Sequence, residues 1–482
     1  MNKTDLQRIN ANTYEVPLGT REFMRVPGRL YADEQILESA LGDRAIEQLT
    51  NTTALPGVTK WALAMPDVHQ GYGPPIGGVV PIEEANGVIS PGATGYDINC
   101  GVRLLRSELE VDAVRPFLEE LVNALFRFVP SGVGKGGAVR LDLAQMDGVL
   151  RKGAAWAVAQ DFGTEEDTAF TEEGGSMDGY TPEAISNEAK RRGDDQLGTL
   201  GSGNHFIEVG EVTEIYDAAT ATAFGLFPGQ LVVWIHSGSR GLGHQVCTDY
   251  VKRFQQPMRD YGIVVPDREL VCAPFASPEG QAYYAAMVGA ANYAWANRQL
   301  LAHRVREAVL HVLKARIGSR ALHTVYDVAH NIVKREEYSV DGKPTPLIIH
   351  RKGATRAFGP GNPAIPADYR DVGQPVLVPG NMGTASYVLA GTAQSAELSF
   401  SSACHGAGRA MSRSAAIKQV RGQELQERLR KQGIFVKGES WEGLAEEAPE
   451  AYKDVDRVVK VVHEAGIARK VAKTVPLGVI KG

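Results

Sequence analysis

Cysteine is scarce in this chain, with four among 482 residues, at positions 100, 247, 272 and 404. So few cysteines in so long a chain do not form a disulfide framework, which excludes the class of small secreted, disulfide-stapled proteins. The chain begins with a polar segment, and no uninterrupted apolar run is long enough to cross a bilayer. We therefore predict a cytoplasmic protein without membrane contact, in a compartment that keeps thiols reduced.

An excess of positive charge is also missing, since the formal net charge is −6. The composition shows no global electrostatic sign of a nucleic-acid-binding protein, so any contact with a nucleic acid must be local. Basic side chains cluster at 190–192, 334–335, 350–356 and at Arg409 with Arg413. Such a cluster is most often a solvated face, which is the interpretation that we prefer for 190–192.

The segment 95–103 carries the clearest chemistry in the sequence. Asp97 and Cys100 lie three residues apart between glycines, so one tight loop can present a carboxylate and a thiolate to a metal ion. Histidines follow in similarly small-residue contexts at His205, His236 and His330. A thiolate can bridge two divalent cations, and these residue types suit zinc, cobalt, manganese or iron better than magnesium or calcium. The sequence predicts one metal centre built from four parts of the chain.

A closed structural zinc site is the alternative to a reactive centre. Such sites usually saturate with four cysteine or histidine ligands close together in sequence, whereas these ligands lie on separate segments. Length alone suggests about three domains, but a centre that draws on residues between 97 and 405 requires the segments to fold together. We therefore predict a single domain over 1–482, and no repeat of fixed period divides it.

His405 is the centre of a second candidate site, in the segment 401–413. Two glycines and two alanines keep its surroundings small, so a phosphate can approach the backbone. A helix that starts near Gly408 would direct free N–H groups and a positive dipole end at that phosphate. The imidazole could then attack a phosphorus atom, or it could serve as a sixth metal ligand, and the residue pattern leaves both roles open.

Two other loops contain residues of chemical interest. Asp67 and His69 stand where a short apolar run, 61–66, passes into a glycine loop, and such a pair is more often structural than catalytic. We expect a supporting or RNA-contact role for them. The glycine-rich segment 131–137 carries Lys135 but is not a P-loop, because the Gly-Lys-Ser/Thr ending is missing.

Periodicity predicts a mixture of helices and strands, and hence an α+β fold. Apolar residues recur at helical spacing in the segments 33–50, 115–128, 182–192 and 281–317. The last of these is one long buried helix or two in tandem. Strands are expected at 231–235, 376–378 and 386–389, and as a hairpin with an Asp-Gly turn over 337–349. The polar segment 161–180 is expected to be exposed, and the chain after 422 to be mostly helical until 475.

Several longer motifs resemble those of the RtcB family of RNA-splicing ligases. They are the block around Asp97 and Cys100, the segments 200–208, 236–241 and 405–409, and the terminal Gly-Val-Ile-Lys-Gly at 478–482. The resemblance runs over nearly the whole chain in the family's order, so the chain is identified as a member of the family. It implies a single large compact α+β fold of mixed sheets and helices with a central dinuclear metal cleft.

The resemblance also implies how the metals are held. Cys100 would bridge two divalent ions, with Asp97 and His205 completing one site and His236 and His330 the other. The family uses manganese, which makes Mn²⁺ the expected metal. Open positions on each ion would then receive phosphate oxygens or an attacking hydroxyl.

GTP is the co-substrate that the resemblance implies, and His405 is the residue that becomes guanylylated. Guanine presents two donors, N1–H and the N2 amine, which the carboxylate of Glu208 can accept together. Asn381 stands where the family has a serine. Lys481 lies one residue from the end of the sequence, where a frayed, dispensable tail is the ordinary expectation. The implied nucleotide contacts are Asn204, Phe206, Glu208, Asn381, Gly406, Ala407, Gly408, Tyr452 and Lys481.

The reaction implied is the joining of a 2′,3′-cyclic-phosphate or 3′-phosphate RNA end to a 5′-hydroxyl end, through guanylyl-histidine and a GMP-activated RNA end. It would serve tRNA splicing, RNA repair or both, with an archease-type protein as a candidate activator. Arg240, Lys352, Arg409 and Arg413 are the candidates for phosphate or RNA contacts. A metal-dependent phosphodiesterase or RNA-end hydrolase without a nucleotide is the rival enzyme, and an RNA-binding scaffold is the non-enzymatic alternative.

Overall fold

Two large mixed sheets form the body of the protein. The computed structural model describes residues 1–132, 136–137, 139–317 and 322–482, with Lys135 of the glycine-rich segment outside them. The strand order of the first sheet is β1 (Gln7–Asn10), β2 (Thr13–Val16), β3 (Gly28–Tyr31), β4 (Ala62–His69), β5 (Ile76–Glu83), β13 (Lys343–Lys352) and β12 (Asn331–Val340). That of the second is β11 (His323–Ala329), β7 (Gly101–Glu110), β9 (Gln230–Ser237), β8 (Phe206–Ile215), β19 (Ala468–Lys481), β16 (Ser386–Gly391) and β15 (Pro375–Val378), with β18 (Phe435–Gly438) beside β19.

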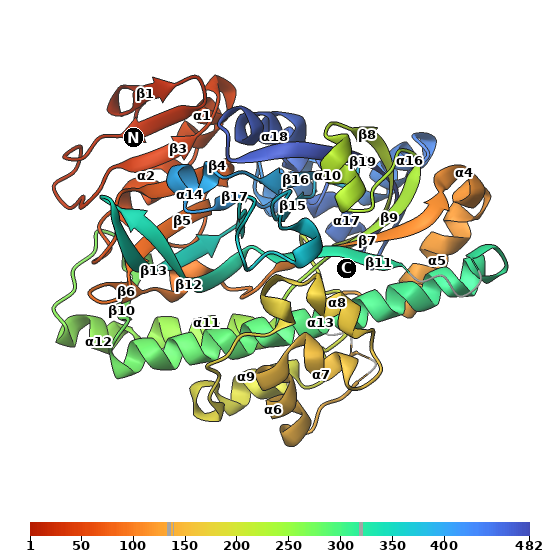
Figure 1. Cartoon of the computed structure of the whole chain (residues 1–482), viewed down its shortest axis with the longest axis horizontal. Helices are drawn as coiled ribbons and strands as arrows, with labels where there is room; N and C mark the ends of the chain where they lie inside the picture. Colours follow the sequence, from red (N-terminus) through yellow and green to blue (C-terminus); the bar gives the residue numbers. More distant parts are fainter. Residues whose placement is uncertain (133–135, 138, 318–321) are drawn as a thin grey trace.

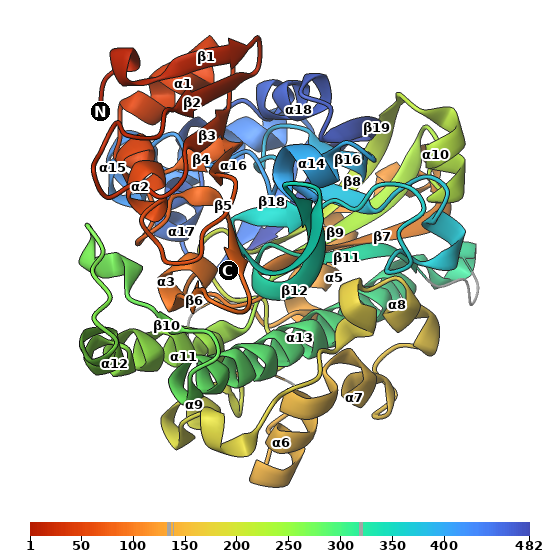
Figure 2. The same cartoon turned by 60° about the vertical axis from the view of Figure 1, so that its left-hand side comes forward.

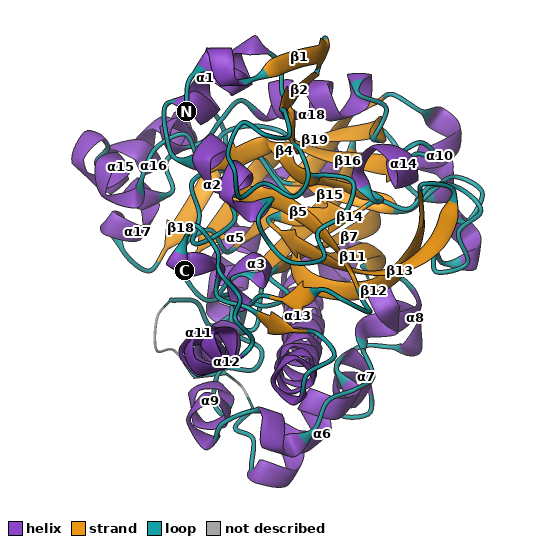
Figure 3. Ribbon diagram, turned by 90° about the vertical axis from the view of Figure 1, so that its left-hand side faces the viewer, coloured by secondary structure: helices purple, strands orange, loops and turns teal. Residues whose placement is uncertain are grey.

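Two short pairs of strands form separate two-stranded sheets, and helices surround the strands (Figure 3). The pairs are β6 (Val88–Ile89) with β10 (Ala273–Pro274), and β14 (Ala354–Arg356) with β17 (Ser402–Cys404). The α-helices are α1 (Glu34–Leu41), α2 (Ala45–Thr52), α3 (Pro91–Thr94), α4 (Val111–Val114), α5 (Leu118–Phe128), α6 (Leu143–Lys152), α7 (Ala154–Val158), α8 (Glu165–Ala169), α9 (Asn187–Gly193), α10 (Ala218–Ala223), α11 (Arg240–Arg253), α12 (Gln255–Asp260), α13 (Pro278–Ile317), α14 (Ser395–Ser399), α15 (Arg413–Gln419), α16 (Gly422–Lys431), α17 (Trp441–Glu446) and α18 (Val455–Glu464).

Helix α13 is one unbroken helix of 40 residues, which decides between the two alternatives for 281–317. It runs beneath the sheets in Figures 1 and 2, with α6 and α7 packed on its outer side and β9 on the other. Tyr283, Tyr293 and Trp295 are fully buried, as predicted for core packing. A helix with apolar side chains all round is expected to be buried on all sides.

The predicted hairpin is confirmed as β12 and β13, which pair antiparallel around the turn Asp341–Gly342. Both turn residues have positive φ, +49° and +77°, as an Asp-Gly hairpin turn requires. The strands predicted at 231–235, 376–378 and 386–389 are confirmed as β9, β15 and β16. The mixed α+β class is therefore confirmed.

Pairing in the second sheet aligns the ends of five strands. Gly101 of β7 lies opposite Ala329 of β11 and Ser237 of β9. One residue along, His236 pairs with Phe206 of β8, which in turn pairs with Lys481 of β19. Residues far apart in sequence thus form a line across one end of the sheet.

Three sequence predictions about local structure are wrong. The segment 33–50 is two helices, because the chain turns at Gly42 and the Asp43 carboxylate accepts from the N–H of Ala45 at the start of α2. The chain after 422 contains the predicted helices α16, α17 and α18, but also the unpredicted strands β18 and β19, the latter pairing with β8 and β16. No helix starts at Gly408: the chain there forms a loop, and α15 begins at Arg413.

The segment 161–180 is not simply exposed. Asp167 and Glu172 are buried in it and bind cations from other parts of the chain. Arg306 donates to Asp167, and Lys334 donates to Glu172. Polar composition misled the prediction, because buried carboxylates with cationic partners look like surface residues in a sequence. As to the bilayer, none of the helices in the described ranges has both the length and the apolar character to cross it.

The chain end is part of the second sheet, contrary to the expectation of a frayed tail. Lys481 is buried and pairs with Phe206 on one side and Gly438 on the other. Gly482 packs so closely that a Cβ there would lie 2.8 Å from the nitrogen of Gly132.

We predict that removing residues 481 and 482 lowers the thermal midpoint of unfolding by a few degrees, because ladder hydrogen bonds and a buried ion pair worth about 2–4 kcal/mol are lost. Differential scanning calorimetry of the truncated and full chains measures the change. Lys481→Met, which keeps the backbone ladder, is the matched control and should lose less. A truncated chain that melts with the full chain would contradict this.

Candidate metal and nucleotide site

Every residue predicted above as a metal, nucleotide, phosphate or catalytic residue lines one cavity of about 460 Å³. Residues of both large sheets contribute to it, among them His69 of β4, Lys352 of β13, Glu208 of β8 and Lys481 of β19. The convergence that the sequence analysis predicted therefore takes place in the structure. The roles of these residues depend on the geometry described next.

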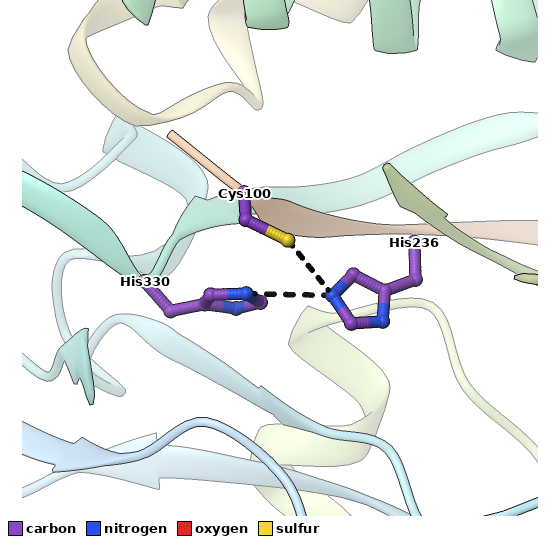
Figure 4. A group of neighbouring side chains, drawn as sticks. All are labelled: Cys100, His236 and His330. Carbon is purple, nitrogen blue, oxygen red and sulfur yellow. Dashed lines mark hydrogen bonds between the residues drawn. The ribbon is translucent and has the colours of Figure 1, made fainter. Parts of the chain in front are cut away.

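Two sets of donor atoms meet at Cys100. Asp97, Cys100 and His205 form one set, and Cys100, His236 and His330 form the other, with the donor atoms of each set within 4.8 Å of one another. Figure 4 shows the second set, in which the two imidazoles and the thiol point toward a common centre. Each set could hold one metal ion, and the sulfur belongs to both.

The hydrogen-bonding geometry of the first set favours a cation bound between its donor atoms. His205 Nδ1 lies 3.0 Å from the carbonyl oxygen of Leu200, to which it can only donate, so its Nε2 carries a lone pair. That Nε2 faces Asp97 Oδ2 at 2.9 Å and Cys100 Sγ at 3.4 Å. A lone pair directed at a carboxylate is repulsive unless a proton or metal ion lies between them. A backbone carbonyl behind the distal nitrogen is also the usual support of a metal-bound histidine.

The second set brings two imidazoles together at the same sulfur, although neither Nδ1 has a hydrogen-bond partner among the described residues. His236 Nε2 lies 3.3 Å from Cys100 Sγ and 3.4 Å from His330 Nε2. Burial lowers the pKa of both histidines well below the usual value, and the neighbouring imidazoles lower it further. Neutral imidazoles with converging lone pairs are suited to a transition-metal ion.

Burial also raises the pKa of the Cys100 thiol, and the nearby Asp97 carboxylate raises it further. The charges of Arg298 and Arg240 act in the opposite direction. A cation bound by the sulfur would favour the thiolate, so metal binding at this site should release a proton.

Asp97 is held in place by the loop that follows His236. Ser239 donates its backbone N–H and its hydroxyl to Asp97 Oδ1, at 2.9 and 3.1 Å. Gly238 makes this approach feasible, since a Cβ there would lie 2.3 Å from the same oxygen. The other carboxylate oxygen is thereby directed toward His205.

His405 follows β17 and lies beside the second donor set, with its ring centroid 5.0 Å from that of His330. Its backbone N–H donates to Asp67 Oδ2 at 2.9 Å, and its Nδ1 hydrogen-bonds to the same oxygen. Asp67 is fully buried. The carboxylate therefore holds the proton on Nδ1 and leaves the lone pair on Nε2, which is the state of a nucleophile.

The far side of the cavity is built around Glu447. Lys481 Nζ donates to Glu447 Oε2 at 3.2 Å, Arg409 Nη1 donates to Oε1 at 2.9 Å, and the Tyr452 hydroxyl donates to Oε2. Lys481 also lies over the ring of Phe206, which packs edge-on against His236. This contact chain connects the metal-ligand side of the cavity to the Glu447 side.

Glu208 lies in the same region and is buried. Ser386 Oγ is its hydroxyl neighbour, at 3.4 Å. Burial raises the pKa of Glu208 to about 8, although the charge of Lys481 opposes the increase. Asn381 lines the cavity from the turn after β15, where its side chain accepts from the N–H of Gly383.

The basic candidates divide into two groups. Arg240, Lys352, Arg409 and Arg413 line the cavity. Burial lowers the pKa of Lys352 to about 7, and the ammonium donates to the carbonyl oxygens of Tyr72 and Pro74. Arg413 is the most exposed of the four and lies near Glu446.

Most basic residues of the remaining clusters are paired within the fold, and Arg335, which is about half exposed, pairs with Glu84. Lys334 and Arg356 are buried against Glu172 and Glu173, and Arg351 is buried against Glu336. Their charges are neutralised within the core and do not line the cavity. Arg191 and Arg192 are exposed, in agreement with the solvated face predicted there.

Sequence reasoning missed Glu447, Tyr72, Tyr96 and Asn331 in the cavity wall. Glu447 follows a segment predicted only as helix, and no spacing distinguishes it from a surface acid. Asn331 adjoins His330 and donates to the carbonyl oxygen of Asp97 at 3.0 Å. Its position next to a predicted ligand was the only available signal.

Two adjoining donor sets share a cysteine and lie beside a histidine oriented by a buried carboxylate, and these residues could hold metal ions. Residues 48–482 match the family model described as tRNA-splicing ligase RtcB, and the chain belongs to this family. A protein of that name from Thermococcus kodakarensis is 55% identical over 99% of both chains. Those from Methanococcus maripaludis and Aeropyrum pernix are 50% and 51% identical, over at least 99% of each chain.

We predict that Cys100→Ala reduces bound metal at both sets, whereas His330→Ala spares the set of Asp97 and His205. The reason is that the sulfur belongs to both sets. Elemental analysis after dialysis against Mn²⁺ should show a larger loss in Cys100→Ala, with circular dichroism to verify folding. Equal residual metal in the two variants would argue against a shared thiolate.

Proposed function

We propose that this protein is a metal- and GTP-dependent RNA ligase. It joins an RNA end with a 2′,3′-cyclic phosphate or 3′-phosphate to an end with a 5′-hydroxyl. Relatives along the whole chain are named tRNA-splicing ligase RtcB, so tRNA halves are the proposed RNA. The observation that carries the proposal is His405, whose Nδ1 is hydrogen-bonded to Asp67 while the ring lies beside His330 of the second donor set.

The first proposed step is transfer of GMP to His405. The Nε2 lone pair attacks the α-phosphorus of GTP, the bond to the bridging oxygen breaks, and pyrophosphate leaves. Asp67 supports this step because it keeps the Nδ1 proton in place and stabilises the positive charge that develops on the ring. Gly408, with φ of +72°, lets the loop after His405 pack against the Asp67 backbone, where a Cβ would lie 2.1 Å from the Asp67 carbonyl oxygen.

The RNA 3′-phosphate then displaces His405 from the GMP phosphorus, which gives an RNA end activated by GMP. In the last step the 5′-hydroxyl oxygen attacks the RNA 3′-phosphate, GMP leaves, and the hydroxyl proton is released. A cyclic phosphate is first opened to the 3′-phosphate by water. Divalent ions held by the donor sets would supply Lewis-acid stabilisation of charge on the phosphoryl oxygens. Arg240, Lys352 and Arg413 are the proposed cationic partners of the RNA phosphates.

Guanine recognition is proposed for Glu208. Its ionised carboxylate can accept from N1–H and the N2 amine together, which adenine cannot offer. Phe206 and Tyr452 supply aromatic surface near it, while Lys481 and Arg409 surround Glu447 with positive charge. Asn204, Asn381 and the backbone of 406–408 are the remaining proposed nucleotide contacts.

The test of the proposal is incubation with α-labelled GTP and Mn²⁺. Acid-labile, base-stable label should remain on the protein, and ligation of a cyclic-phosphate end to a 5′-hydroxyl end should require GTP. A protein that opens the cyclic phosphate but takes up no label would be the rival end-processing hydrolase instead.

We predict that His405→Ala lowers GMP transfer and ligation of cyclic-phosphate ends by about 10³-fold or more, since the nucleophile is missing. The same variant should still join an RNA whose 3′ end already carries the diphosphate link to guanosine, because that step needs only the metals and the 5′-hydroxyl. Gel analysis of both substrates measures this, with metal content as the control. Failure on the activated RNA in a folded, metal-loaded variant would give His405 a different role.

A pH dependence follows from the pKa of Glu208, which is raised to about 8. Below that pH the carboxyl holds a proton and presents a donor to the donors of guanine, so affinity for GTP should weaken by up to about tenfold per pH unit between pH 8 and 6. Isothermal titration of His405→Ala with GTP avoids the covalent step. Adding Glu208→Gln to this variant should weaken GTP binding and remove this pH dependence. The titration of GTP itself contributes equally to both pH profiles. Identical profiles with and without Glu208 would contradict the prediction.

A further inference from the structure

A single buried guanidinium connects the three segments that carry the second donor set. Arg298 belongs to α13, is fully buried, and is not among the residues that line the cavity. It lies behind the ligand-bearing segments. Its side chain therefore touches neither the proposed substrates nor the metal ions.

All five N–H groups of Arg298 are used. Nη1 donates to the carbonyl oxygens of Asn99 and Ser237, at 2.8 and 3.0 Å. Nη2 donates to Asn99 Oδ1 at 2.9 Å and to Asp327 Oδ1 at 2.7 Å. Nε donates to Asp327 Oδ2 at 2.9 Å. Asn99 directly precedes Cys100, Ser237 directly follows His236, and Asp327 lies in β11 just before His330.

Asn99 has a left-handed backbone conformation, with φ of +51°. Asparagine adopts this conformation more readily than other non-glycine residues, and here several hydrogen bonds hold it there. Its backbone N–H donates to Asn331 O at 2.6 Å, its side-chain amide donates to Ala291 O at 2.7 Å, and both of its oxygens accept from Arg298. The turn that directs the Cys100 sulfur into the cavity thus depends on these bonds.

We infer that Arg298, acting through Asn99, is a positioning residue that fixes the geometry of the second donor set. It ties the backbones next to Cys100 and His236 to the strand that leads to His330. This inference rests on the proposed two-metal site and adds a residue outside it. Gly101 agrees with the tight fit, since a Cβ there would lie 2.9 Å from the Arg298 guanidinium.

Arg103 provides a matched comparison within the same charge cluster. It is equally buried, and its Nε donates to Asp327 Oδ2 at 2.9 Å. Its other nitrogens donate to Gln299 and Thr171, and none of these three bonds reaches Asn99 or Ser237. Loss of Arg103 therefore disturbs the buried ion pair without removing those backbone contacts.

The test replaces each arginine by lysine in the full chain. An ammonium keeps the charge but cannot reach two carbonyls, an amide and a carboxylate from one planar group. Both variants, and the parent, are loaded with Co²⁺ and followed by absorption of the sulfur-to-cobalt band, by the magnetic coupling of the two ions, and by titration of the second ion. Thermal melting reports the loss of stability separately.

Arg298→Lys should bind the second ion at least tenfold more weakly, with a changed sulfur band and weaker coupling. Arg103→Lys should keep the parent spectrum even where its thermal midpoint falls as far. Asn99→Gly is the second variant, to be used if Arg298→Lys does not fold. Glycine tolerates the left-handed backbone but lacks the Oδ1 that accepts from Arg298. The cobalt spectrum of this variant should change in the same direction.

A parent-like spectrum and affinity in a folded Arg298→Lys or Asn99→Gly chain would overturn the inference, as would an equal change in Arg103→Lys. If the parent itself binds no coupled pair of ions, the proposed two-metal site fails first, and the two failures are distinguished by that measurement.

Discussion

The Nε2 atoms of His205 and His236 both lie against the Cys100 sulfur, at 3.4 and 3.3 Å, with the two ring centroids 5.4 Å apart. Such an arrangement repels itself unless cations separate its members, so the fold must hold the donors together against that repulsion. It does so with backbone contacts rather than with the donor side chains alone. The N–H of His330 donates to the carbonyl oxygen of Cys100 at 2.9 Å, and the N–H of Asn99 donates to that of Asn331.

Buried charge supplies much of this rigidity. The cluster of Arg103, Arg298 and Asp327 lies under the ligand loops, and Glu172 accepts from the N–H of Ala329, the residue before His330. Buried ion pairs contribute little net stability when compared with apolar packing. Their value in this protein lies in geometry, because each charge has several directed partners that define where a ligand-bearing strand lies.

The residue types of the site could be predicted from sequence because chemistry restricts them. Thiol, imidazole and carboxylate next to glycines indicated a metal centre, and the family resemblance added the proposed nucleotide contacts around Glu208 and Lys481. The supporting residues could not be found in this way. Arg298 lies within a long helix and Glu447 after another, and their partners are brought together only by the tertiary fold.

Elements of the fold that depend on neighbouring residues could be predicted, and elements that depend on tertiary contacts could not. Local signals such as the Asp-Gly turn and the apolar run before His236 were reliable, because neighbouring residues determine them. The long strand β19 was misread, since a strand with mixed lysine and valine depends on its partners β8 and β16 for its conformation. The buried carboxylates of 161–180 were misread for the same reason.

The sheet connections have a consequence for inheritance. The first sheet joins strands from 7–16 to strands from 331–352, and the second joins 101–110 to 468–481. We propose that the chain forms one folding unit, because a genetic crossover anywhere between Asp67 and Lys481 would take the two parts of the site from different parents.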